Sequence, residues 1–375
     1  MKKKICIVVS SAMTVNAFLR EPIRCLSEYY DVHVMLNLNS EESLSGIDGS
    51  VKILPIRIER KISSWRDCQA MWKMFRLFHR YQFQLVHSVT PKAGLLAITS
   101  AFLAGVGIRI HTFTGQVWAT RRGFSRWFLK NVDRWIGWLS TDALVDSASQ
   151  HRFLLREGVL TEAKSGVLAR GSISGVDTYR FKPDDRARAK IRNGLSIPAE
   201  DVIFLYLGRM NRDKGLLDLA SAFAGIDNAG AHLLVVGPDE ERIGPKMLML
   251  AERNTKRVHF VGFSEKPEEY LAAADVLCLP SYREGFGNVV IEAAAVGIPA
   301  IGSRIYGLVD AIAENESGLL FEARNVKELQ ACLSLICNDS ALRTRLGRQA
   351  RERVLAQFTS ERLALAWLDY YQARL

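Results

Sequence analysis

The sequence predicts an α/β protein with two Rossmann-like domains, each built on a parallel sheet. Short runs rich in β-branched residues alternate with longer amphipathic stretches along all 375 residues. Strands that alternate with helices form parallel sheets that carry helices on both faces. The alternation falls into two sets, and the chain is long enough for two domains of ordinary size.

The first set predicts a domain at residues 1–172. Its basic N-terminus leads into an apolar run only as long as a strand, so we interpret that run as a strand and not as a secretion signal. The helical patterns lie near residues 17–29, 65–81, 93–104 and 125–139. The predicted strands cover residues 5–9, 32–36, 51–55, 85–88, 108–113 and 143–146.

The second set predicts a domain at residues 173–357, after a joint near residues 170–200 that holds glycines, prolines and a charged run. A final helix at residues 358–375 can pack back onto the first domain. The predicted strands cover residues 202–207, 232–236, 258–261, 276–279 and 299–302, and the helices lie near 215–223, 245–253, 267–274, 288–295 and 326–338.

The positive charge of the chain lies in its first half. Residues 1–170 carry 24 basic and 13 acidic residues, net +11, whereas residues 171–375 carry 26 and 27, net −1. Six of the seven tryptophans also lie in the first half. A basic half rich in tryptophan indicates a negatively charged partner, such as a membrane surface or a nucleic acid.

The composition excludes several classes of protein. An apolar fraction of 48% excludes global disorder, and no apolar run reaches the ~18 residues of a spanning helix. The six cysteines are scattered and form no CxxC pair, so the common zinc motifs are absent. We interpret them as small core residues in a reducing cytosol.

The loop after the strand at residues 202–207 is the first candidate site, because open parallel sheets bind ligands at the carboxyl ends of their strands. Gly208 and Arg209 follow that strand, and Lys214 comes just before the next helix. These two cations suit a pyrophosphate, because the planar fork of Arg binds two oxygens and Lys adds a movable charge. The alternative is an ordinary solvated basic loop.

The second candidate site follows the strand at residues 276–279. Glycines flank Phe286, and the helix that begins near Asn288 offers backbone N–H groups to anionic oxygens. Glu284 precedes the turn and Glu292 lies about one helical turn beyond it, so the two carboxylates can meet hydroxyls at opposite ends of a ligand. Glu292 can equally be a charge on the helix surface.

Together, the segments GRMNRDKG and EGFGNVVIE resemble the family 4 retaining glycosyltransferases. Their fold, called GT-B, has two Rossmann-like domains with parallel sheets facing across a central cleft. The stretches GSISGVDTYRF, VHFVGF, ADVLCLPS, AVGIP and ESGLL match the family in order. The stretch HSVTPKAGLLA and the later Thr114-Gly115 resemble members that build bacterial surface polysaccharides.

The resemblance implies a role for each matched position of the donor site. Arg209 and Lys214 would neutralise the donor pyrophosphate and Glu284 would bind the donor sugar, and we expect these three to be the catalytic residues. The other matched positions would bind substrate. Gly208 belongs to the first loop, Gly262 and Phe263 would lie near the nucleobase, and Glu292 would bind the ribose hydroxyls. The backbone N–H groups around Phe286, Gly287 and Asn288 would bind sugar and phosphate.

The first domain departs from the family pattern at two places. The loop after its first strand reads SSAMT, where the family usually has a Gly-rich loop. Many members carry a His before Gly on the strand that enters the cleft, whereas this chain has Thr114 before Gly115, with His111 three residues earlier. We assign all three residues to the substrate site. The alternative for His111 is a packed, locally hydrogen-bonded side chain.

Residues 121–138 form an amphipathic pattern in the basic half. Arg122, Arg126, Lys130 and Arg134 recur every four residues on one face of a helix, and apolar residues occupy the opposite side. Basic and apolar arcs flanked by tryptophans are typical of a helix in a membrane interface. The alternative is an ordinary Rossmann helix, which hides its apolar side against the sheet and leaves its basic side in water.

The sequence thus predicts a retaining hexosyltransferase that transfers a hexose or N-acetylhexosamine from a nucleotide sugar, with UDP favoured, to a lipid-linked glycan. The pathway would be lipopolysaccharide O-antigen or capsule synthesis. We expect no cofactor, no metal and no nucleic-acid partner, and peripheral binding to the cytoplasmic face of the inner membrane through an anionic lipid surface. The alternatives are an epimerase or hydrolase on the same fold, and a non-catalytic protein that binds membranes or nucleic acid.

Overall fold

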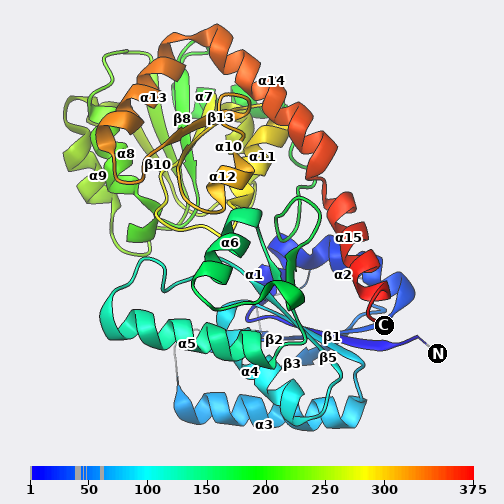
Figure 1. The fold of residues 1–375 in the computed structure, drawn as a ribbon. Coiled ribbons are helices and arrows are strands. Elements are labelled where there is room, and N and C mark those ends of the chain that lie inside the picture. Colours follow the sequence, from blue (N-terminus) through cyan, green and yellow to red (C-terminus); the bar gives the residue numbers. More distant parts are fainter. Residues whose placement is uncertain (1, 39–43, 45, 48, 60–62) are drawn as a thin grey trace. The chain divides into compact units, whose positions relative to one another are not determined.

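The computed structural model describes residues 2–38, 44, 46–47, 49–59 and 63–375. The chain forms two compact units (Figure 1). Unit 1 comprises Met1–Gly175 with Ser360–Leu375, and unit 2 comprises Val176–Thr359. The boundaries expected from the sequence, after residues 172 and 357, lie a few residues earlier.

The described part of unit 1 builds a parallel sheet of seven strands in the order β3-β2-β1-β4-β5-β6-β7. Ile5 and Ile7 of β1 enter one core cluster, whereas Cys6 and Val8 enter another on the opposite face. Burial on both faces is the pattern of a fully covered parallel sheet. The strands are β1 (Lys4–Val8), β2 (Asp31–Leu36), β3 (Lys52–Pro55), β4 (Leu85–Val89), β5 (Ile108–Phe113), β6 (Asp142–Val145) and β7 (Ser165–Val167).

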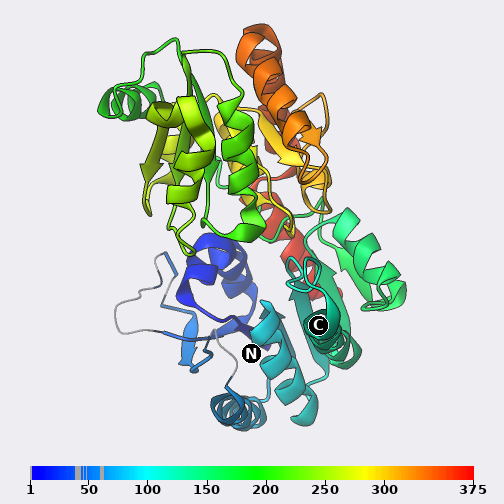
Figure 2. The same cartoon turned by 90° about the vertical axis from the view of Figure 1, so that its left-hand side faces the viewer.

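Helices cover both faces of this sheet (Figures 1 and 2). On one face, α3 (Ser64–Tyr81), α4 (Pro91–Leu103) and α5 (Gly123–Leu139) pack side by side. On the other face, α2 (Arg20–Tyr29) packs against α15 (Ser360–Gln372). The remaining helical segments are α1 (Ala12–Thr14), the π-helical turn Val15–Leu19, α6 (Ala148–Arg156) and the 3₁₀ turn Glu162–Lys164.

A buried polar contact fixes the C-terminal helix α15 within unit 1. The Nδ1 atom of His87 on β4 lies 2.7 Å from the hydroxyl of Tyr371, and its Nε2 atom lies 2.7 Å from the hydroxyl of Thr112. Trp367 stacks on the His87 ring, with centroids 4.6 Å apart. Burial lowers the pKa of His87 well below 6.5, so a neutral imidazole joins the two hydroxyls. The tail therefore completes the core of unit 1.

The described part of unit 2 builds a parallel sheet of six strands in the order β10-β9-β8-β11-β12-β13. The central strands β8 (Val202–Leu207) and β11 (Val276–Leu279) are neighbours, although they are far apart in the chain. The loops that follow them therefore lie side by side at the carboxyl edge. The other strands are β9 (Ala231–Val236), β10 (Val258–Val261), β12 (Ala300–Ser303) and β13 (Gly318–Phe321).

Two groups of helices pack around the unit 2 sheet (Figure 2). One group is α8 (Leu216–Ala224), α9 (Gly244–Ala251) and α13 (Val326–Asn338). The other group is α7 (Asp185–Gly194), α10 (Pro267–Ala273), α11 (Asn288–Val296) and α14 (Ser340–Gln357). The short helical segments are Arg212–Lys214, Glu252–Arg257 and α12 (Leu308–Ala311).

A buried ion cluster ties α7 to the rest of unit 2. Arg192 is 3% exposed, and its Nη2 atom lies 2.5 Å from Oδ2 of Asp275. Arg188 holds the other carboxylate oxygen at 2.7 Å. The backbone N–H of Ile203 on β8 also donates to Oδ2 of Asp275, at 2.7 Å. One carboxylate therefore joins a helix and a central strand.

We expect Asp275→Ala to lower the free energy of unfolding by about 3–5 kcal/mol, because it leaves the buried Arg192 without its counter-charge. Denaturant titration followed by circular dichroism measures the loss. Glu200→Ala is the matched control and should change stability far less, because Glu200 is an exposed carboxylate just before β8. Equal losses in both variants would contradict the prediction.

The fold class expected from the sequence is confirmed, since both units are parallel α/β structures. The predicted strands match observed strands to within one residue at each end. Strands β7 and β13 and helices α6, α7 and α14 were not predicted. The boundary between the units, after Gly175, lies inside the joint expected near residues 170–200, and α7 occupies part of the same range and packs on α10.

Helix α5 buries Ile136 and Leu139 in the core of unit 1, but it does not leave its whole basic side in water as an ordinary Rossmann helix would. Arg126 and Lys130 form ion pairs with Glu157, at 3.0 and 2.6 Å, and both cations lie over the Trp118 ring. Arg134 donates to the backbone carbonyls of Glu157 and Gly158. The basic side of α5 is therefore largely occupied, and several of its aromatic residues face outward. No helix among the described residues has the length and apolar character needed to span a bilayer.

Candidate functional site

The candidate site of unit 2 is formed by the loops that follow β8 and β11, which meet at the carboxyl edge of the sheet. Gly215, at the end of the first loop, has a left-handed backbone with φ of +67°. A Cβ atom there would lie only 2.0 Å from the carbonyl oxygen of Pro280 on the second loop. Glycine therefore allows the two loops to touch.

This contact brings Lys214 and Glu284 together. The Nζ atom of Lys214 lies 2.5 Å from Oε1 of Glu284, and the hydroxyl of Ser281 donates to the same oxygen at 2.8 Å. The two side chains remain 20% and 13% exposed. Two predicted catalytic residues thus form one ion pair, with the carboxylate oriented by two donors and still within reach of solvent.

Arg209, the third predicted catalytic residue, lies on the same loop as Lys214. Its backbone carbonyl accepts a hydrogen bond from the buried Tyr206 hydroxyl at 2.7 Å. Burial, together with the charge of Glu284, raises the pKa of Tyr206, which therefore remains a donor. The guanidinium pairs with Glu240 at 3.1 Å and is 47% exposed. Such an exposed pair is weak, so an anionic ligand can compete for Arg209.

The turn before α11 presents its backbone to the surface and buries its aromatic ring. Phe286 is 2% exposed and packs against Phe358, with ring centroids 5.4 Å apart. Gly287 has φ of +86°, and a Cβ there would lie 2.6 Å from a methyl carbon of Leu308. Gly287 and Asn288 are partly exposed at the helix N-terminus, where the helix dipole favours an anion.

Glu292 lies on α11, one turn beyond that N-terminus, and is partly buried. Burial raises the pKa of its carboxyl, Arg180 opposes the rise and the charge of Glu268 adds to it, and the resulting pKa is about 7. No hydrogen bond from another described residue offsets this cost. A half-buried carboxylate of this kind is suited to accept hydrogen bonds from ligand hydroxyls.

Gly262 and Phe263 lie just after β10 and are exposed. Phe263 is 69% exposed, and the space around Gly262 is open. The carbonyl oxygen of Gly262 accepts a hydrogen bond from the backbone of Gly237 at 3.1 Å. The turn after β10 is thus joined to the turn after β9 at the same carboxyl edge of the sheet.

The three site residues predicted in the first domain lie on or after β5 of unit 1. Thr114 and Gly115 follow the carboxyl end of β5 and are partly exposed. His111 is 1% exposed, and its Nδ1 atom lies 2.8 Å from the Ser88 hydroxyl. Burial lowers the pKa of His111 to about 3, so its ring is neutral. His111 is therefore packed and hydrogen-bonded locally, which is the environment expected from the sequence as the alternative to a role in the substrate site.

A group of buried polar side chains lies beside Thr114 and was not predicted from the sequence. Gln150 donates to the carbonyl of Phe113 at 3.0 Å and to the side chain of Gln116 at 3.1 Å, and its own oxygen accepts from the backbone of Asp146. Burial raises the pKa of Asp146 to about 7, and its Oδ1 atom has no partner among the described residues. The signal in the sequence was the run of polar residues after β6.

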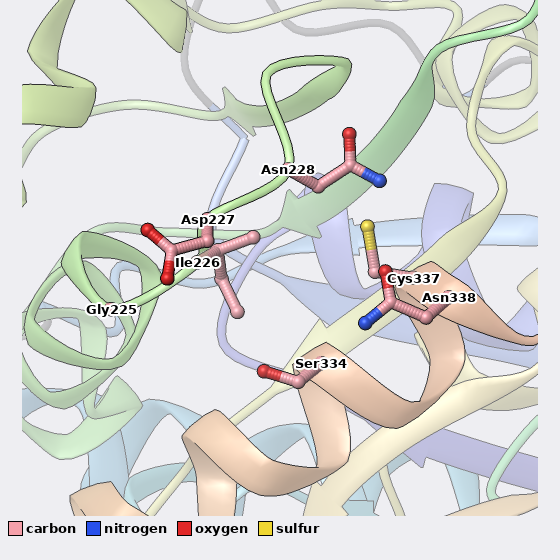
Figure 3. A pocket seen from close by; sticks show the side chains of 7 residues that line it. All are labelled: Gly225, Ile226, Asp227, Asn228, Ser334, Cys337 and Asn338. Atoms are coloured by element: carbon pink, nitrogen blue, oxygen red, sulfur yellow. The ribbon is translucent and has the colours of Figure 1, made fainter.

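A polar pocket of about 410 Å³ lies elsewhere in unit 2, where α8 and α13 end (Figure 3). Its loop precedes β9, so the pocket belongs to the amino edge of the sheet, away from the predicted site residues. The residues that line it are Gly225, Ile226, Asp227, Asn228, Ser334, Cys337 and Asn338.

Two family models match the chain in order. The glycosyl transferase 4-like model covers residues 4–134, and the glycosyl transferases group 1 model covers residues 187–353. A curated relative is the capsular polysaccharide biosynthesis glycosyltransferase CapM of Staphylococcus aureus. It is 30% identical over 337 residues, which span 88% of this chain and 87% of CapM.

Solved structures support the same fold. Sucrose-phosphate synthase from Thermosynechococcus elongatus aligns with a TM-score of 0.83 at 23% identity, over 99% of both chains. HepE of Anabaena, determined in complex with UDP-glucose, aligns with a TM-score of 0.80 at 17% identity, again over 99% of both chains. At these identities the likeness shows the fold alone. Together with the CapM alignment and the two family models, it establishes that the chain belongs to the group 1, family 4-like glycosyltransferases of GT-B fold.

Proposed function

We propose that this glycosyltransferase moves a hexose or N-acetylhexosamine from a UDP-sugar to a lipid-linked glycan during synthesis of a bacterial surface polysaccharide, such as capsule or O-antigen. We propose further that it retains the anomeric configuration, needs no metal or cofactor, and works on the cytoplasmic face of the inner membrane. The observation that carries the proposal is the Lys214–Glu284 ion pair beside Arg209, at the carboxyl edge of the unit 2 sheet.

These residues match the demands of glycosyl transfer. The bond between the anomeric carbon and the diphosphate oxygen breaks, so negative charge develops on the diphosphate, where Lys214 and Arg209 stabilise it. The acceptor hydroxyl forms the new bond on the same face of the sugar, and its proton goes to the departing phosphate oxygen. Glu284, oriented by Lys214 and Ser281, accepts hydrogen bonds from sugar hydroxyls and fixes the ring.

Two comparisons support the choice of substrates. CapM, the relative at 30% identity, is a capsular polysaccharide glycosyltransferase by name, and HepE was determined with UDP-glucose. The cationic pair supplies positive charge for the donor phosphates without a metal ion. We favour a glycan acceptor on a lipid carrier because such intermediates are the usual substrates of surface-polysaccharide synthesis at the membrane.

A ligand screen followed by product analysis tests the proposal. Thermal shift with UDP-, GDP-, ADP- and CMP-sugars should show stabilisation by UDP-sugars above all, because a ligand that binds the native state stabilises it. NMR of the product formed in EDTA should show the anomeric configuration of the donor. Inversion of configuration would contradict the retaining mechanism, and loss of turnover in EDTA that Mg²⁺ restores would contradict metal independence.

Donor binding should weaken below pH 7 through Glu292. The pKa of Glu292 is about 7 in the free protein, so its carboxyl becomes protonated below that pH. Ribose hydroxyls favour the ionised carboxylate, so donor binding requires Glu292 to lose that proton. The apparent affinity should therefore fall by up to about tenfold per pH unit below 7. Calorimetric titration with UDP from pH 5.5 to 8 measures the slope. Glu292→Gln should bind more weakly at pH 8 and flatten the profile, and an unchanged slope would remove the ribose role.

A further inference from the structure

A set of large apolar side chains is exposed on the layer formed by α3, α4 and α5, and we call this set the aromatic face. The three helices lie side by side on one face of the unit 1 sheet (Figures 1 and 2). The exposed fractions of these side chains run from 44% to 75%. Exposed apolar groups gathered in this way usually mark an interaction site. The face comprises Trp65, Trp72, Phe102, Leu103, Phe124, Trp127, Phe128, Trp135 and Trp138.

Ring contacts join members of the aromatic face within and between helices. Phe124, at the start of α5, contacts Trp127 and Phe128, with centroids 5.7 and 6.2 Å apart. At the other end of α5, Trp138 lies 5.4 Å from Trp135 and 6.3 Å from Phe102 on α4. Six of the nine side chains are therefore held in two clusters, one at each end of α5.

The helices that carry the aromatic face are strongly basic. They hold only two acidic residues, and neither offers a free charge. Asp67 pairs with Lys92 at 2.8 Å, and the buried Asp133 accepts a hydrogen bond from Trp118 at 2.7 Å. The basic residues of the three helices are Arg66, Lys73, Arg76, Arg80, Lys92, Arg126, Lys130 and Arg134.

The cations that remain available lie beside the aromatic residues. Arg76 lies over the Trp72 ring, 4.7 Å from its centroid, and both side chains are exposed. Lys73 and Arg80 on the same helix are exposed too, as are Arg121 and Arg122 just before α5. By contrast, Arg126 and Lys130 are committed to Glu157. In the described part of the chain, these three helices thus combine aromatic side chains with positive charge, and neither of their two carboxylates is free.

We propose that the aromatic face docks unit 1 on an anionic lipid bilayer. The inference rests on the proposed function in naming a membrane-bound acceptor, and it assigns the contact to the outward aromatic side chains and not to the basic stripe of α5. Indole rings prefer the headgroup boundary because they combine an apolar body with a polar N–H, and the neighbouring Arg and Lys meet lipid phosphates. The charge of the three helices complements such a surface.

The test is cosedimentation with vesicles of phosphatidylethanolamine and phosphatidylglycerol, compared with phosphatidylcholine alone. The variant combines Trp65→Ser, Phe124→Ser and Trp138→Ser, whose side chains are 74%, 75% and 66% exposed. Because these residues are mostly in water, the fold should persist, which circular dichroism and the melting temperature check. We expect partitioning onto anionic vesicles to fall at least about tenfold.

Matched controls separate the aromatic contact from general effects. Tyr179→Ser combined with Met249→Ser removes two side chains that are 80% and 79% exposed on unit 2, and it should leave vesicle binding unchanged. Arg76→Glu with Arg122→Glu should weaken binding to anionic vesicles and leave the weak binding to phosphatidylcholine unaltered. Equal vesicle binding by the triple variant and the wild type would overturn the proposal. The proposal would also be overturned if the wild type were a dimer, the triple variant were a monomer, and both bound vesicles equally. The aromatic face would then join two copies of the chain.

Failure of the proposed function has a different signature. UDP-sugar affinity measured without vesicles reports unit 2 alone and should be the same in the triple variant and the wild type. If the wild type binds vesicles through the aromatic face but binds no UDP-sugar, the docking inference stands and the donor assignment falls. If the wild type binds UDP-sugar but does not bind vesicles, the donor assignment stands and the docking inference falls.

Discussion

Replacing Lys214 with alanine is expected to lower the rate of sugar transfer about 10³-fold and to leave the fold intact. A unit charge about 4 Å from the departing phosphate contributes ~4 kcal/mol at an effective dielectric constant near 20, and this corresponds to about three powers of ten in rate. The substitution also removes one of the two donors that orient Glu284 and leaves the Ser281 hydroxyl as the other. The measurement is kcat for acceptor-dependent UDP release, with the melting temperature as a check on folding.

Two further variants complete this experiment. Glu284→Ala should also abolish transfer, because the sugar then loses the carboxylate that fixes it. Lys256→Ala is the matched control, since Lys256 is exposed just before β10, at the amino edge of the unit 2 sheet. Its turnover should equal that of the wild type. Near-normal turnover in either Lys214→Ala or Glu284→Ala would show that the catalytic site has been misplaced.

Replacing Gly215 with alanine should destabilise the protein strongly and should inactivate the enzyme as well. The new Cβ atom would lie 2.0 Å from the Pro280 carbonyl oxygen, and the backbone at this position has φ of +67°. The two loops must separate to relieve this clash, which moves Lys214 away from Glu284. We expect unfolding to become easier by about 3 kcal/mol or more. Denaturant titration and kcat measure the two losses.

Gly105→Ala is the control for backbone conformation alone. Gly105 has φ of +71°, close to that of Gly215, but no atom lies within 4 Å of a Cβ placed there. Its cost should be about 1 kcal/mol, the penalty of the left-handed conformation, with activity unchanged. If Gly215→Ala cost no more than Gly105→Ala, the loops would not be in the tight contact described.

Most strands of the two sheets could be predicted because a strand that is buried on both faces is a short, continuous run of apolar residues. Helix α7 was missed for the opposite reason. Half of its ten residues are charged and it has few apolar ones, and its place depends on Arg188 and Arg192 reaching Asp275, more than eighty residues away. No local pattern contains that partner, so the residues resembled a linker.

The same limit applies to the candidate site. Position after a strand pointed to Arg209, Lys214 and Glu284, because parallel topology fixes which edge those residues occupy. The ion pair between Lys214 and Glu284 depends on a close approach at Gly215, which only coordinates reveal. Asp146 was not predicted, because the unpaired state of its Oδ1 atom is a property of the packed interior and not of the chain order.

The C-terminal helix α15 has a consequence for the order in which the protein is made. Most of unit 1 precedes unit 2 in the chain, yet Trp367 and Tyr371, which close the unit 1 core around His87, are synthesised only after the whole of unit 2. Unit 2, by contrast, is complete once Thr359 has left the ribosome. Domains generally fold in order from the N-terminus during synthesis, whereas here unit 2 can complete its fold before unit 1 does. Of the two units, unit 1 is therefore completed after unit 2, and a nascent chain that stops short of α15 exposes the aromatic and apolar surface that this helix covers.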